Sequence, residues 1–492
     1  MTDENMLEEQ DINPEIERRM ESITEWRAKG IDPFGSKFQR TKFAKEILDA
    51  YPSNEDDEVS VAGRISAKRD MGKAVFVDLT DPTEKIQVFC KVDLLGQETL
   101  NDITNRMHVG DFIGVKGNVF KTKRGEISLR AKEIRILSKA IRPMPEKWHG
   151  LRDVELRYRQ RYLDMIANPE VRRVFEARGR IIKEIRDYLC EKGFTEVEIP
   201  VFQKIAGGAT ARPFATHHNA QDMDLFLRIS LELHLKMAMI GGLEKVYELS
   251  KVFRNEGMDR DHSPEYTMLE LYQAYADYND MMKIVEDIYL RCALALHNSH
   301  LITYESEQLD FSPPWPRKQY NELMIEYAGI DLAKKPSVDE LQKLAKKYDP
   351  EAVKIKTRGR LIDLIFKHTV ESHLRGPLFV VDYPIEISPL AKKIPDRDGF
   401  VYRFETFIMG SEMANAFTEL NDPIDQRERF LSQMKDRLAG DEEAMQLDEE
   451  FLDAMEHGMP PAGGLGVGID RMVMVLMDQP SIRDVILFPL MK

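Results

Sequence analysis

Five residues with polar chemistry stand on two neighbouring segments near the middle of the chain: Arg254, Glu256, Tyr266, Glu270 and Tyr272. The first segment, "KVYELSKVF", alternates in hydrophobicity, the polar stretch "MDRDHSP" follows, and "EYTMLELYQAY" alternates again. We therefore expect an antiparallel hairpin with a long loop. Because side chains alternate along a strand, the three residues of the second segment share one face. The pattern predicts a surface that carries a carboxylate and two phenols, with a guanidinium near the hairpin tip.

A second unusual segment is "GGLGVGIDRMVMVLM", in which Gly464, Gly466 and Gly468 alternate before Arg471. Glycine weakens a strand interior, so three glycines on one face need a reason. Their spacing matches neither the dinucleotide fingerprint nor the phosphate loop. We expect a strand whose exposed backbone forms a flat floor, followed by a helix that closes near Pro480.

A third polar segment is "RFETFIMGSEMANAFTELND". Its residues Asn415, Phe417 and Glu419 share one face of a strand, and Glu412 is out of phase with them. If all four residues serve one site, the alternation must break near Glu412.

Length and composition describe a globular protein with two or three domains, because 492 residues exceed one ordinary core. The chain has no run of 18 apolar residues, and its amino terminus is acidic where a signal peptide would be basic and then apolar. We therefore expect a cytoplasmic protein. Cys90, Cys190 and Cys292 lack metal-site spacing, and we expect three buried thiols. The net charge of -15 argues against indiscriminate nucleic-acid binding, although residues 121–142 are locally basic.

The elements that must position these residues fall into two groups. Residues 14–50 are helical in pattern, and residues 59–137 alternate like the strands of a small barrel, with Phe76 on the polar face. Phe76 fits a base-stacking platform, and a lone surface aromatic covered by a loop is the alternative. After a proline-rich linker, a helix begins with Asn168 as its cap and Pro169 in its first turn, and it ends at Gly193. The strand-like stretch "TEVEIP" follows and stops at Pro200. Further helices are expected from about Asn279 and within residues 315–376, where Ser337 and Glu340 could form a capping box.

With these segments, the chain closely resembles class II lysyl-tRNA synthetases of the bacterial type over residues 18–488. "GFTEVEIP", the hairpin "FRNEGMDRDHSPEYTMLELYQAY" and "GLGVGIDRM" are similar to the three class II signatures, in order. "VAGRISAKRDMGKAVF", "GGATARPFATHHN" and "NAFTELNDPIDQRERF" add to the resemblance. Together these motifs are highly specific.

The resemblance implies an α+β fold, with a class II catalytic domain around an antiparallel sheet and an all-β OB-fold barrel. The expected parts are a helical extension (1–57), the anticodon-binding OB fold (58–142), a linker (143–150) and the catalytic domain (151–492), with its helical insertion at about 315–376. It also implies a homodimer that forms lysyl-adenylate from L-lysine and ATP with Mg²⁺, then charges tRNA(Lys). No nucleophilic side chain is needed, because the lysine carboxylate attacks the α-phosphorus.

Residue roles also follow from the resemblance. The implied catalytic residues are Arg254 and Arg471. The implied ATP-binding residues are Arg254, Glu256, His262, Tyr266 and Arg471. The implied lysine-binding residues are Gly208, Glu232, Glu270, Tyr272, Asn415 and Glu419. Magnesium would be held by Glu405 and Glu412, and the anticodon by Arg69, Phe76, Gln87 and Glu126. Several acidic groups suit a substrate with two ammonium groups, because a buried carboxylate left unpaired by a neutral competitor costs several kcal/mol.

Each role has a simpler alternative. Arg254 could form a surface ion pair with Glu256, His262 could be a solvated loop residue, and Tyr272 could be an ordinary sheet aromatic with Glu270 as a cross-strand partner. The chain also departs from the usual family pattern. Ser230-Leu231 replaces Ala-Pro, His234 replaces tyrosine, Asp261 precedes His262, and Tyr266 replaces phenylalanine. These departures concern the lysine pocket and the triphosphate affinity.

Three other functions share parts of this pattern. An aspartyl- or asparaginyl-tRNA synthetase would share the architecture, but Glu232, Glu270 and Glu419 suit an acidic or neutral substrate poorly. An enzyme that attaches lysine-like groups to a protein typically lacks the barrel. A non-catalytic RNA-binding relative would have no need of Arg254, Glu256, Glu405, Glu412 and Arg471.

Overall fold

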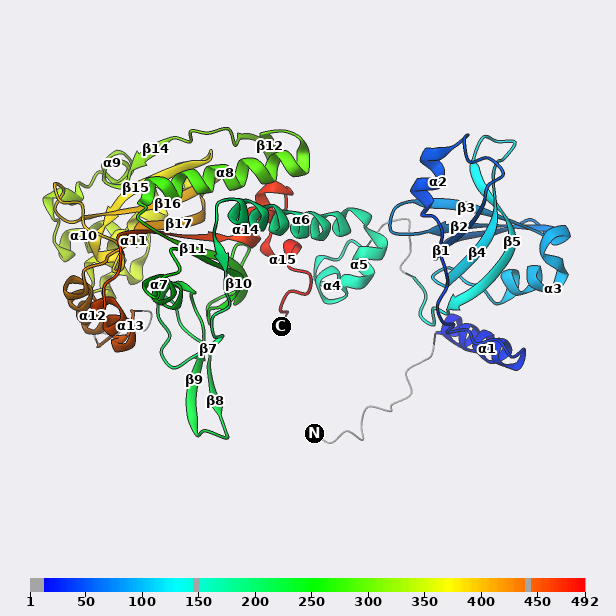
Figure 1. Cartoon of the computed structure of the whole chain (residues 1–492), viewed down its shortest axis with the longest axis horizontal. Coiled ribbons are helices and arrows are strands. Elements are labelled where there is room, and N and C mark those ends of the chain that lie inside the picture. The colour runs from blue at the N-terminus through cyan, green and yellow to red at the C-terminus, as the bar shows by residue number, and fades with distance from the viewer. Residues whose placement is uncertain (1–12, 145–150, 439–443, 492) are drawn as a thin grey trace. The chain divides into compact units, whose positions relative to one another are not determined.

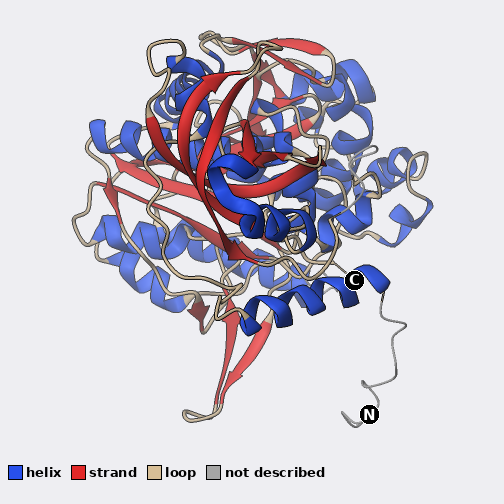
Figure 2. Cartoon of the chain, turned by 90° about the vertical axis from the view of Figure 1, so that its right-hand side faces the viewer, coloured by secondary structure: helices blue, strands red, loops and turns tan. Residues whose placement is uncertain are grey.

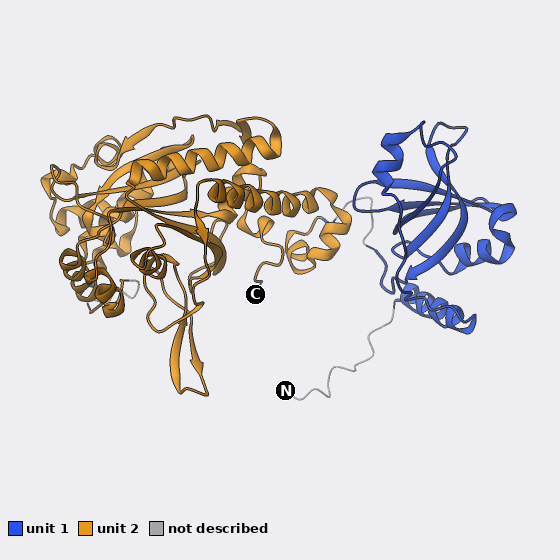
Figure 3. Ribbon diagram, in the orientation of Figure 1, with its two compact units in different colours: residues 1–151 blue, residues 152–492 orange. Residues whose placement is uncertain are grey.

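The computed structural model describes residues 13–144, 151–438 and 444–491, which fall in two compact units, residues 1–151 and 152–492 (Figure 3). The predicted extension therefore lies in part, and the predicted linker in large part, outside the described residues. Among the described residues, no helix is both long and apolar enough to cross a membrane.

The first unit is built on a closed five-stranded barrel with strand order β1-β2-β3-β5-β4. Its strands are β1 (Glu58–Asp70), β2 (Ala74–Thr80), β3 (Lys85–Lys91), β4 (Phe112–Lys121) and β5 (Ile127–Ser138). Helices α1 (Pro14–Ala28) and α2 (Ala44–Ala50) precede the barrel. The predicted alternation is confirmed, because Val75, Val77, Ile86 and Val88 are buried in the barrel core. Helix α3 (Val92–Asn105), between β3 and β4, was not predicted.

A buried charged cluster lies in this first unit. Lys139 Nζ lies 2.7 Å from Asp111 Oδ2, and both side chains are fully buried. The same ammonium lies 2.5 Å from His108 Nδ1. Burial and the neighbouring Lys139 lower the pKa of His108 to about 3, so this imidazole is neutral in the folded protein.

The second unit contains an eight-stranded sheet with strand order β14-β15-β16-β17-β18-β11-β10-β6, antiparallel except at its two edges (Figure 1). Its strands are β6 (Thr195–Glu196), β10 (Lys245–Phe253), β11 (Glu265–Ala274), β14 (Arg317–Gln319), β15 (Leu378–Pro384), β16 (Phe400–Ile408), β17 (Ser411–Thr418) and β18 (Ala462–Gly468). A smaller sheet of β7 (Phe202–Gln203), β8 (Ala215–His218) and β9 (Met223–Leu227) carries a projecting hairpin (Figure 2). Strands β12 (Leu301–Tyr304) and β13 (Glu307–Asp310) form a separate pair.

Helices cover one face of the large sheet. The core on that face joins α6 (Pro169–Glu191), α8 (Tyr278–His297) and α14 (Ile469–Leu476) to Leu269 and Leu271 of β11. The other helices of the unit are α4 (Val154–Arg159), α5 (Arg161–Ala167), α7 (Glu232–Ile240), α9 (Tyr320–Leu323), α10 (Val338–Ala345), α11 (Arg358–Thr369), α12 (Pro423–Leu438), α13 (Glu449–Glu456) and α15 (Ile482–Val485). The opposite face of β11 is therefore available for polar residues.

Three local predictions are wrong. Asn168 does not cap α6, because its side-chain amide donates to Asp164 Oδ1 at 2.7 Å. Cys190 is exposed, although Cys90 and Cys292 are buried as expected. In "TEVEIP" only two residues, Thr195–Glu196, form strand. Within the insertion, the predicted capping box of Ser337 and Glu340 is confirmed at the start of α10.

Candidate active site

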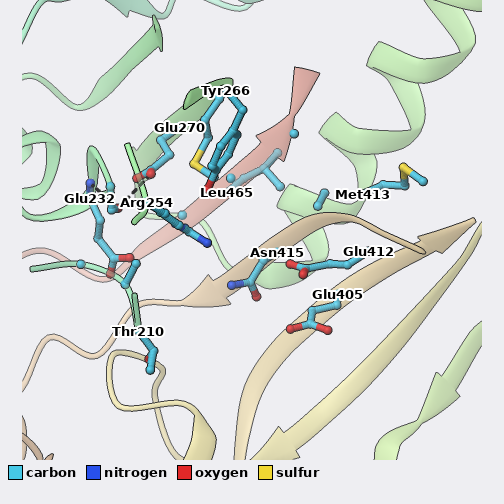
Figure 4. Close-up of a pocket in the computed structure, with 18 of the residues that line it drawn as sticks. Thr210, Glu232, Arg254, Tyr266, Glu270, Glu405, Glu412, Met413, Asn415 and Leu465 are labelled. Carbon is cyan, nitrogen blue, oxygen red and sulfur yellow. Dashed lines mark hydrogen bonds between the residues drawn. The ribbon is translucent and has the colours of Figure 1, made fainter. Parts of the chain in front are cut away.

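A polar pocket of about 340 Å³ opens on the sheet face opposite α6, α8 and α14 (Figure 4). The hairpin of β10 and β11, the strands β17 and β18, and the start of α7 all contribute to it. The predicted ATP, lysine and magnesium residues that line it are Gly208, Glu232, Arg254, Glu256, His262, Tyr266, Glu270, Tyr272, Glu405, Glu412, Asn415 and Arg471. Glu419 does not line it, because its side chain is fully buried next to the pocket.

Strand β11 supplies the centre of the pocket. It pairs with β10 in antiparallel register, as predicted, and with β18 on its other side. Glu270 and Tyr272 face the pocket, whereas Leu269 and Leu271 are fully buried in the helical core on the other face. The alternation along β11 therefore separates polar chemistry from apolar packing.

A β-bulge in β17 brings Glu412 to the pocket. Phe407 of β16 pairs with Glu412, but Thr406 pairs with Ala414, so the register shifts at this point. The extra residue, Met413, restores the phase between Glu412 and Asn415, which both line the pocket. The predicted break in alternation near Glu412 is confirmed.

Two buried carboxylates at one end of the pocket share an ammonium group. Lys236 Nζ lies 2.5 Å from Glu232 Oε1 and also contacts Glu419 Oε2. Lys236 and Glu419 are 1% and 0% exposed. Burial raises the pKa of both carboxyl groups, and the neighbouring Lys236 offsets only part of this rise. Sequence reasoning missed Lys236.

Glu270 sits in a similar environment but is held by neutral donors. Its Oε1 accepts from the Ser230 hydroxyl at 2.9 Å and from the Leu231 backbone N–H at 3.0 Å. Burial and the neighbouring Glu232 raise the pKa of Glu270 to about 7, although these two hydrogen bonds and Arg254 oppose the shift. Close to neutral pH, a cationic ligand would therefore favour the ionised form.

The hairpin tip and the start of α14 supply cations. Arg254 Nε donates to the carbonyl of Ile229 at 3.3 Å, and its guanidinium lies 5.5 Å from the centre of the Tyr266 ring. Arg471 donates to the carbonyl of Glu412 at 2.6 Å and lies 3.2 Å from His262 Nε2. His262 is in turn held by Asp259, at 2.9 Å from its Nδ1. Loop, helix and β17 thus meet at Arg471.

Glu405 and Glu412 extend from neighbouring strands into one part of the pocket (Figure 4). Glu405 accepts from Arg403 at 2.5 Å and from the Tyr383 hydroxyl at 2.8 Å. Burial and the nearby Glu412 raise the pKa of Glu405, which is the response of like charges that a cation would relieve. Among the described residues, no group of three or more metal-binding side chains gathers. Two carboxylates fit Mg²⁺, because this ion takes its other ligands from phosphate and water.

Gly464, Gly466 and Gly468 of β18 line the pocket but differ in what surrounds them. A Cβ atom on Gly464 would overlap the Glu419 carboxylate and the Tyr272 ring. A Cβ atom on Gly466 or Gly468 would approach no atom closer than 3.8 Å. Gly464 therefore makes room for protein side chains, whereas the other two leave a bare floor in the pocket.

The first unit carries the four predicted anticodon residues on β1, β2, β3 and the turn before β5. Arg69 forms two hydrogen bonds to Asp78, at 2.8 and 3.1 Å. Gln87 donates to Glu126 at 2.9 Å. Phe76 is not a lone aromatic, because its ring centre lies 5.0 Å from that of Phe89.

The row of aromatic rings extends across the barrel. Phe89 lies 6.0 Å from Phe120, and the Arg130 guanidinium lies 4.7 Å from the centre of the Phe120 ring. All three phenylalanines are partly exposed. Half-exposed rings beside amide and guanidinium groups form the kind of surface on which bases stack.

Known proteins resemble the chain over both units. Residues 153–492 match the class II tRNA synthetases (D, K and N), and residues 59–137 match the OB-fold nucleic acid binding domain. The lysine–tRNA ligase of Moorella thermoacetica is 51% identical over 474 residues, 96% of this chain and 97% of the relative. That of Pelotomaculum thermopropionicum is 52% identical over 490 residues, 98% of this chain and 96% of the relative. The chain belongs to the lysine–tRNA ligase family of class II tRNA synthetases. The lysine–tRNA ligase of Clostridium tetani, at 48% identity over 491 residues, covers both chains almost completely.

Two charged residues that contact pocket carboxylates of this lysine–tRNA ligase family member were not predicted. Lys236 follows Glu232 by one helical turn, and this i,i+4 spacing predicts a pair, but the sequence does not reveal that both are buried. Arg403 precedes Glu405 by two positions on one strand face, and it donates to Asn415 Oδ1 at 3.0 Å as well as to Glu405. Strand alternation was the available signal for Arg403.

Proposed function

We propose that this protein is a lysine–tRNA ligase that activates L-lysine with ATP and transfers the lysine to the 3' end of tRNA(Lys). The observation that supports this most strongly is the acidic end of the pocket, where Glu232 and Glu419 lie close to Glu270, and Glu270 in turn lies close to Arg254. An acidic pocket matches the two ammonium groups of lysine, and the neighbouring guanidinium matches its carboxylate and the phosphate that this carboxylate attacks.

The first step needs positioning and charge stabilisation. A lysine carboxylate oxygen attacks the α-phosphorus, the bond from that phosphorus to the bridging oxygen breaks, and pyrophosphate leaves. Arg254 holds the α-phosphate and orients the carboxylate, and Arg471 covers the adenine with Tyr266 on its other side. Glu256 accepts from the adenine amino group, and His262 meets the γ-phosphate. Glu405 and Glu412 would hold Mg²⁺, which neutralises phosphate charge when bound.

The second step uses the same pocket. The oxygen of a terminal tRNA ribose hydroxyl attacks the carbonyl carbon of lysyl-adenylate, the bond from this carbon to the phosphate oxygen breaks, and AMP leaves with the bonding electrons. The hydroxyl proton passes to the departing phosphate. Gly208, Glu232 and Glu270 surround the α-amine and Asn415 lies near the carboxylate, whereas Glu419 and Tyr272 surround the ε-amine. Such a site penalises a neutral analogue, which leaves buried carboxylates unpaired.

In the barrel, we propose that Phe76 stacks on an anticodon base and that Arg69, Gln87 and Glu126 hydrogen-bond anticodon uridines. Single-stranded RNA loops are generally recognised by such stacking and edge contacts. The proposed working form is a cytoplasmic homodimer, as the family resemblance implies. The proposed parts of the chain remain an extension (1–57), the OB fold (58–142), a linker (143–150) and the catalytic domain (151–492).

The test is amino-acid-dependent exchange of pyrophosphate into ATP with lysine, asparagine or aspartate as the substrate. We expect exchange with lysine alone, followed by charging of tRNA(Lys). Because the matching family includes enzymes for aspartate and asparagine, exchange with asparagine and not with lysine would overturn the proposal.

A further inference from the structure

We propose that Ser230, together with the Leu231 backbone, positions Glu270 and keeps it ionised, so that Ser230 sets the pH range in which lysine binds. This inference rests on the proposed function, because it takes Glu270 as a group that binds an ammonium of lysine. Ser230 acts through Glu270 and is therefore a positioning residue.

The contacts of Glu270 are unequal at its two oxygens. Oε1 accepts two hydrogen bonds, from Ser230 Oγ at 2.9 Å and from Leu231 N at 3.0 Å. Among the described residues, Oε2 accepts only from the Tyr272 hydroxyl, at 3.3 Å. Glu270 lines the pocket, so one oxygen is anchored and the other has acceptor capacity left for a ligand.

Ser230 also joins Glu270 to the first turn of α7. Its hydroxyl oxygen accepts from the Glu232 backbone N–H at 3.1 Å while its hydrogen points to Glu270. Ser230, Leu231, Glu232 and Glu270 are all at most 5% exposed. A single, largely buried hydroxyl therefore links two of the proposed lysine-binding residues.

The departure from the family pattern at these positions has a chemical consequence. Alanine at position 230 has no hydroxyl, and proline at position 231 has no backbone N–H. The usual Ala-Pro pair could donate neither of the two hydrogen bonds that Glu270 receives here. Ser230-Leu231 thus supplies two neutral donors to a buried carboxylate whose environment opposes ionisation.

The electrostatic surroundings determine what those donors do. Burial and Glu232 raise the pKa of Glu270 to about 7, and the bonds from Leu231 and Ser230 lower it. Losing one donor to an ionised acceptor corresponds to a pKa change of about one unit. The titratable groups around Glu270 and its partners are Glu232 and Lys236 on α7, Glu248 on β10, Arg254 after β10, Tyr266 and Tyr272 on β11, and Glu419 after β17.

The experiment measures the KM for lysine in pyrophosphate exchange between pH 6 and 8.5, for the wild type and for Ser230→Ala. We expect the wild-type KM to rise as the pH falls below about 7. In Ser230→Ala the rise should begin about one pH unit higher, giving about a fivefold larger KM at pH 7 and almost no change at pH 8.5. The KM for ATP should stay at the wild-type value.

Calorimetry of lysine binding in two buffers of different ionisation enthalpy gives a second readout, without catalysis. Because lysine selects the ionised carboxylate, binding at pH 7 should release about half a proton from the wild type and about nine-tenths of a proton from Ser230→Ala. A merely structural role for Ser230 would change the thermal midpoint and leave the proton count unchanged.

Two further variants separate the possible failures. Ser312→Ala is the control, because it removes a serine–carboxylate hydrogen bond of 2.6 Å, to Asp310, from an exposed serine that does not line the pocket. Its pH profile should equal that of the wild type. Glu270→Gln should raise the KM for lysine at every pH. A wild-type KM in Glu270→Gln would overturn the proposed role of Glu270 itself. A raised KM in Glu270→Gln with an unshifted profile in Ser230→Ala would overturn the inference alone.

Discussion

Lys236 Nζ lies 2.5 Å from Glu232 Oε1, and both side chains are almost completely buried. The same ammonium contacts Glu419, so the protein keeps one lysine side chain of its own at the acidic end of the pocket. This resident cation offsets part of the repulsion among Glu232, Glu270 and Glu419, which would otherwise favour protonation of the carboxylates. Without such a cation, burial and mutual repulsion would favour the protonated form of the three carboxyl groups. The protonated groups would then bind an ammonium group poorly.

Replacing Lys236 with methionine should therefore destabilise the second unit by about 3–5 kcal/mol, because two buried carboxylates lose their partner. The measurement is thermal or chemical unfolding, followed by fluorescence. Lys283→Met is the control, since it removes an exposed i,i+4 pair with Asp287 and should barely change the midpoint. Lys236→Arg is a second variant, which keeps the positive charge. A midpoint for Lys236→Met equal to that of the wild type would show that the ion pair does not contribute to the free energy of unfolding.

Arg254→Ala should abolish adenylate formation, because the α-phosphate loses its main protein partner. We expect pyrophosphate exchange to fall by at least about 100- to 1000-fold, with an unchanged thermal midpoint. Arg260→Ala, in the same loop but paired with Glu305, should retain exchange. Near-normal exchange in Arg254→Ala would remove Arg254 from the mechanism.

Two alanine substitutions on β18 should have different effects. In Gly464→Ala, the new methyl group would overlap Glu419 and Tyr272, so we expect a large rise in the KM for lysine or loss of the fold. In Gly468→Ala, the nearest atoms belong to Met413, at 3.8 Å, and Arg471, at 4.0 Å. The protein should therefore fold normally, and the methyl group beside the proposed ATP-binding Arg471 should raise the KM for ATP. The measurement is the KM for lysine and the KM for ATP in pyrophosphate exchange. Equal changes of both KM values in each variant would contradict the assignment of the two glycines to different substrates.

Phe76→Ala should weaken tRNA charging and leave pyrophosphate exchange intact, because stacking on a base is worth about 1–3 kcal/mol. Phe112→Ala is the matched barrel control, since Phe112 packs under Arg64 and not in the aromatic row with Phe89. The KM for tRNA in aminoacylation is the measurement. Equal losses in charging and exchange would identify Phe76 as a residue of the fold.

The His108 cluster should make the barrel sensitive to acid. Folding lowers the pKa of the His108 imidazole from 6.5 to about 3. Between pH 3 and pH 6.5, the unfolded chain therefore binds more protons than the folded one. Barrel stability should therefore fall as the pH drops below 6.5, by at most about 1.4 kcal/mol per pH unit from this group. Hydrogen exchange of β4 and β5 reports on the barrel alone. The slope should flatten in His108→Gln, and an unchanged slope would assign the acid sensitivity to other groups.

Strong periodicity made much of the fold predictable. The hairpin around Arg254, the helix after Pro169 and the strand faces of β2 and β3 all follow from side-chain spacing, and the structure confirms them. The order of strands in the large sheet was not predictable, because β18 enters between β11 and β17 after a long excursion of the chain. Nor does spacing reveal that Asn168 bonds Asp164 instead of capping its helix.

In the pocket too, some features were predictable from the sequence and others were not. Its predicted lining residues come together around one cavity, but their roles remain predictions. What the sequence could not show is which partners hold those residues. The pairing of Lys236 with Glu419 joins positions far apart in the chain, and Ser230 reaches Glu270 only because α7 packs against β11. Such contacts depend on three-dimensional packing and leave no local pattern.

The extra residue in β17 has a consequence for how this protein tolerates change. On either side of Met413 the strand is read in two different phases, so a backbone that paired regularly through Met413, without the bulge, would put Glu412 out of phase with Asn415. That regularity would turn Glu412 away from the cavity and toward the helical core, where its charge could not be solvated. In this strand an irregular backbone is the functional form, and repairing it would cost the enzyme one carboxylate.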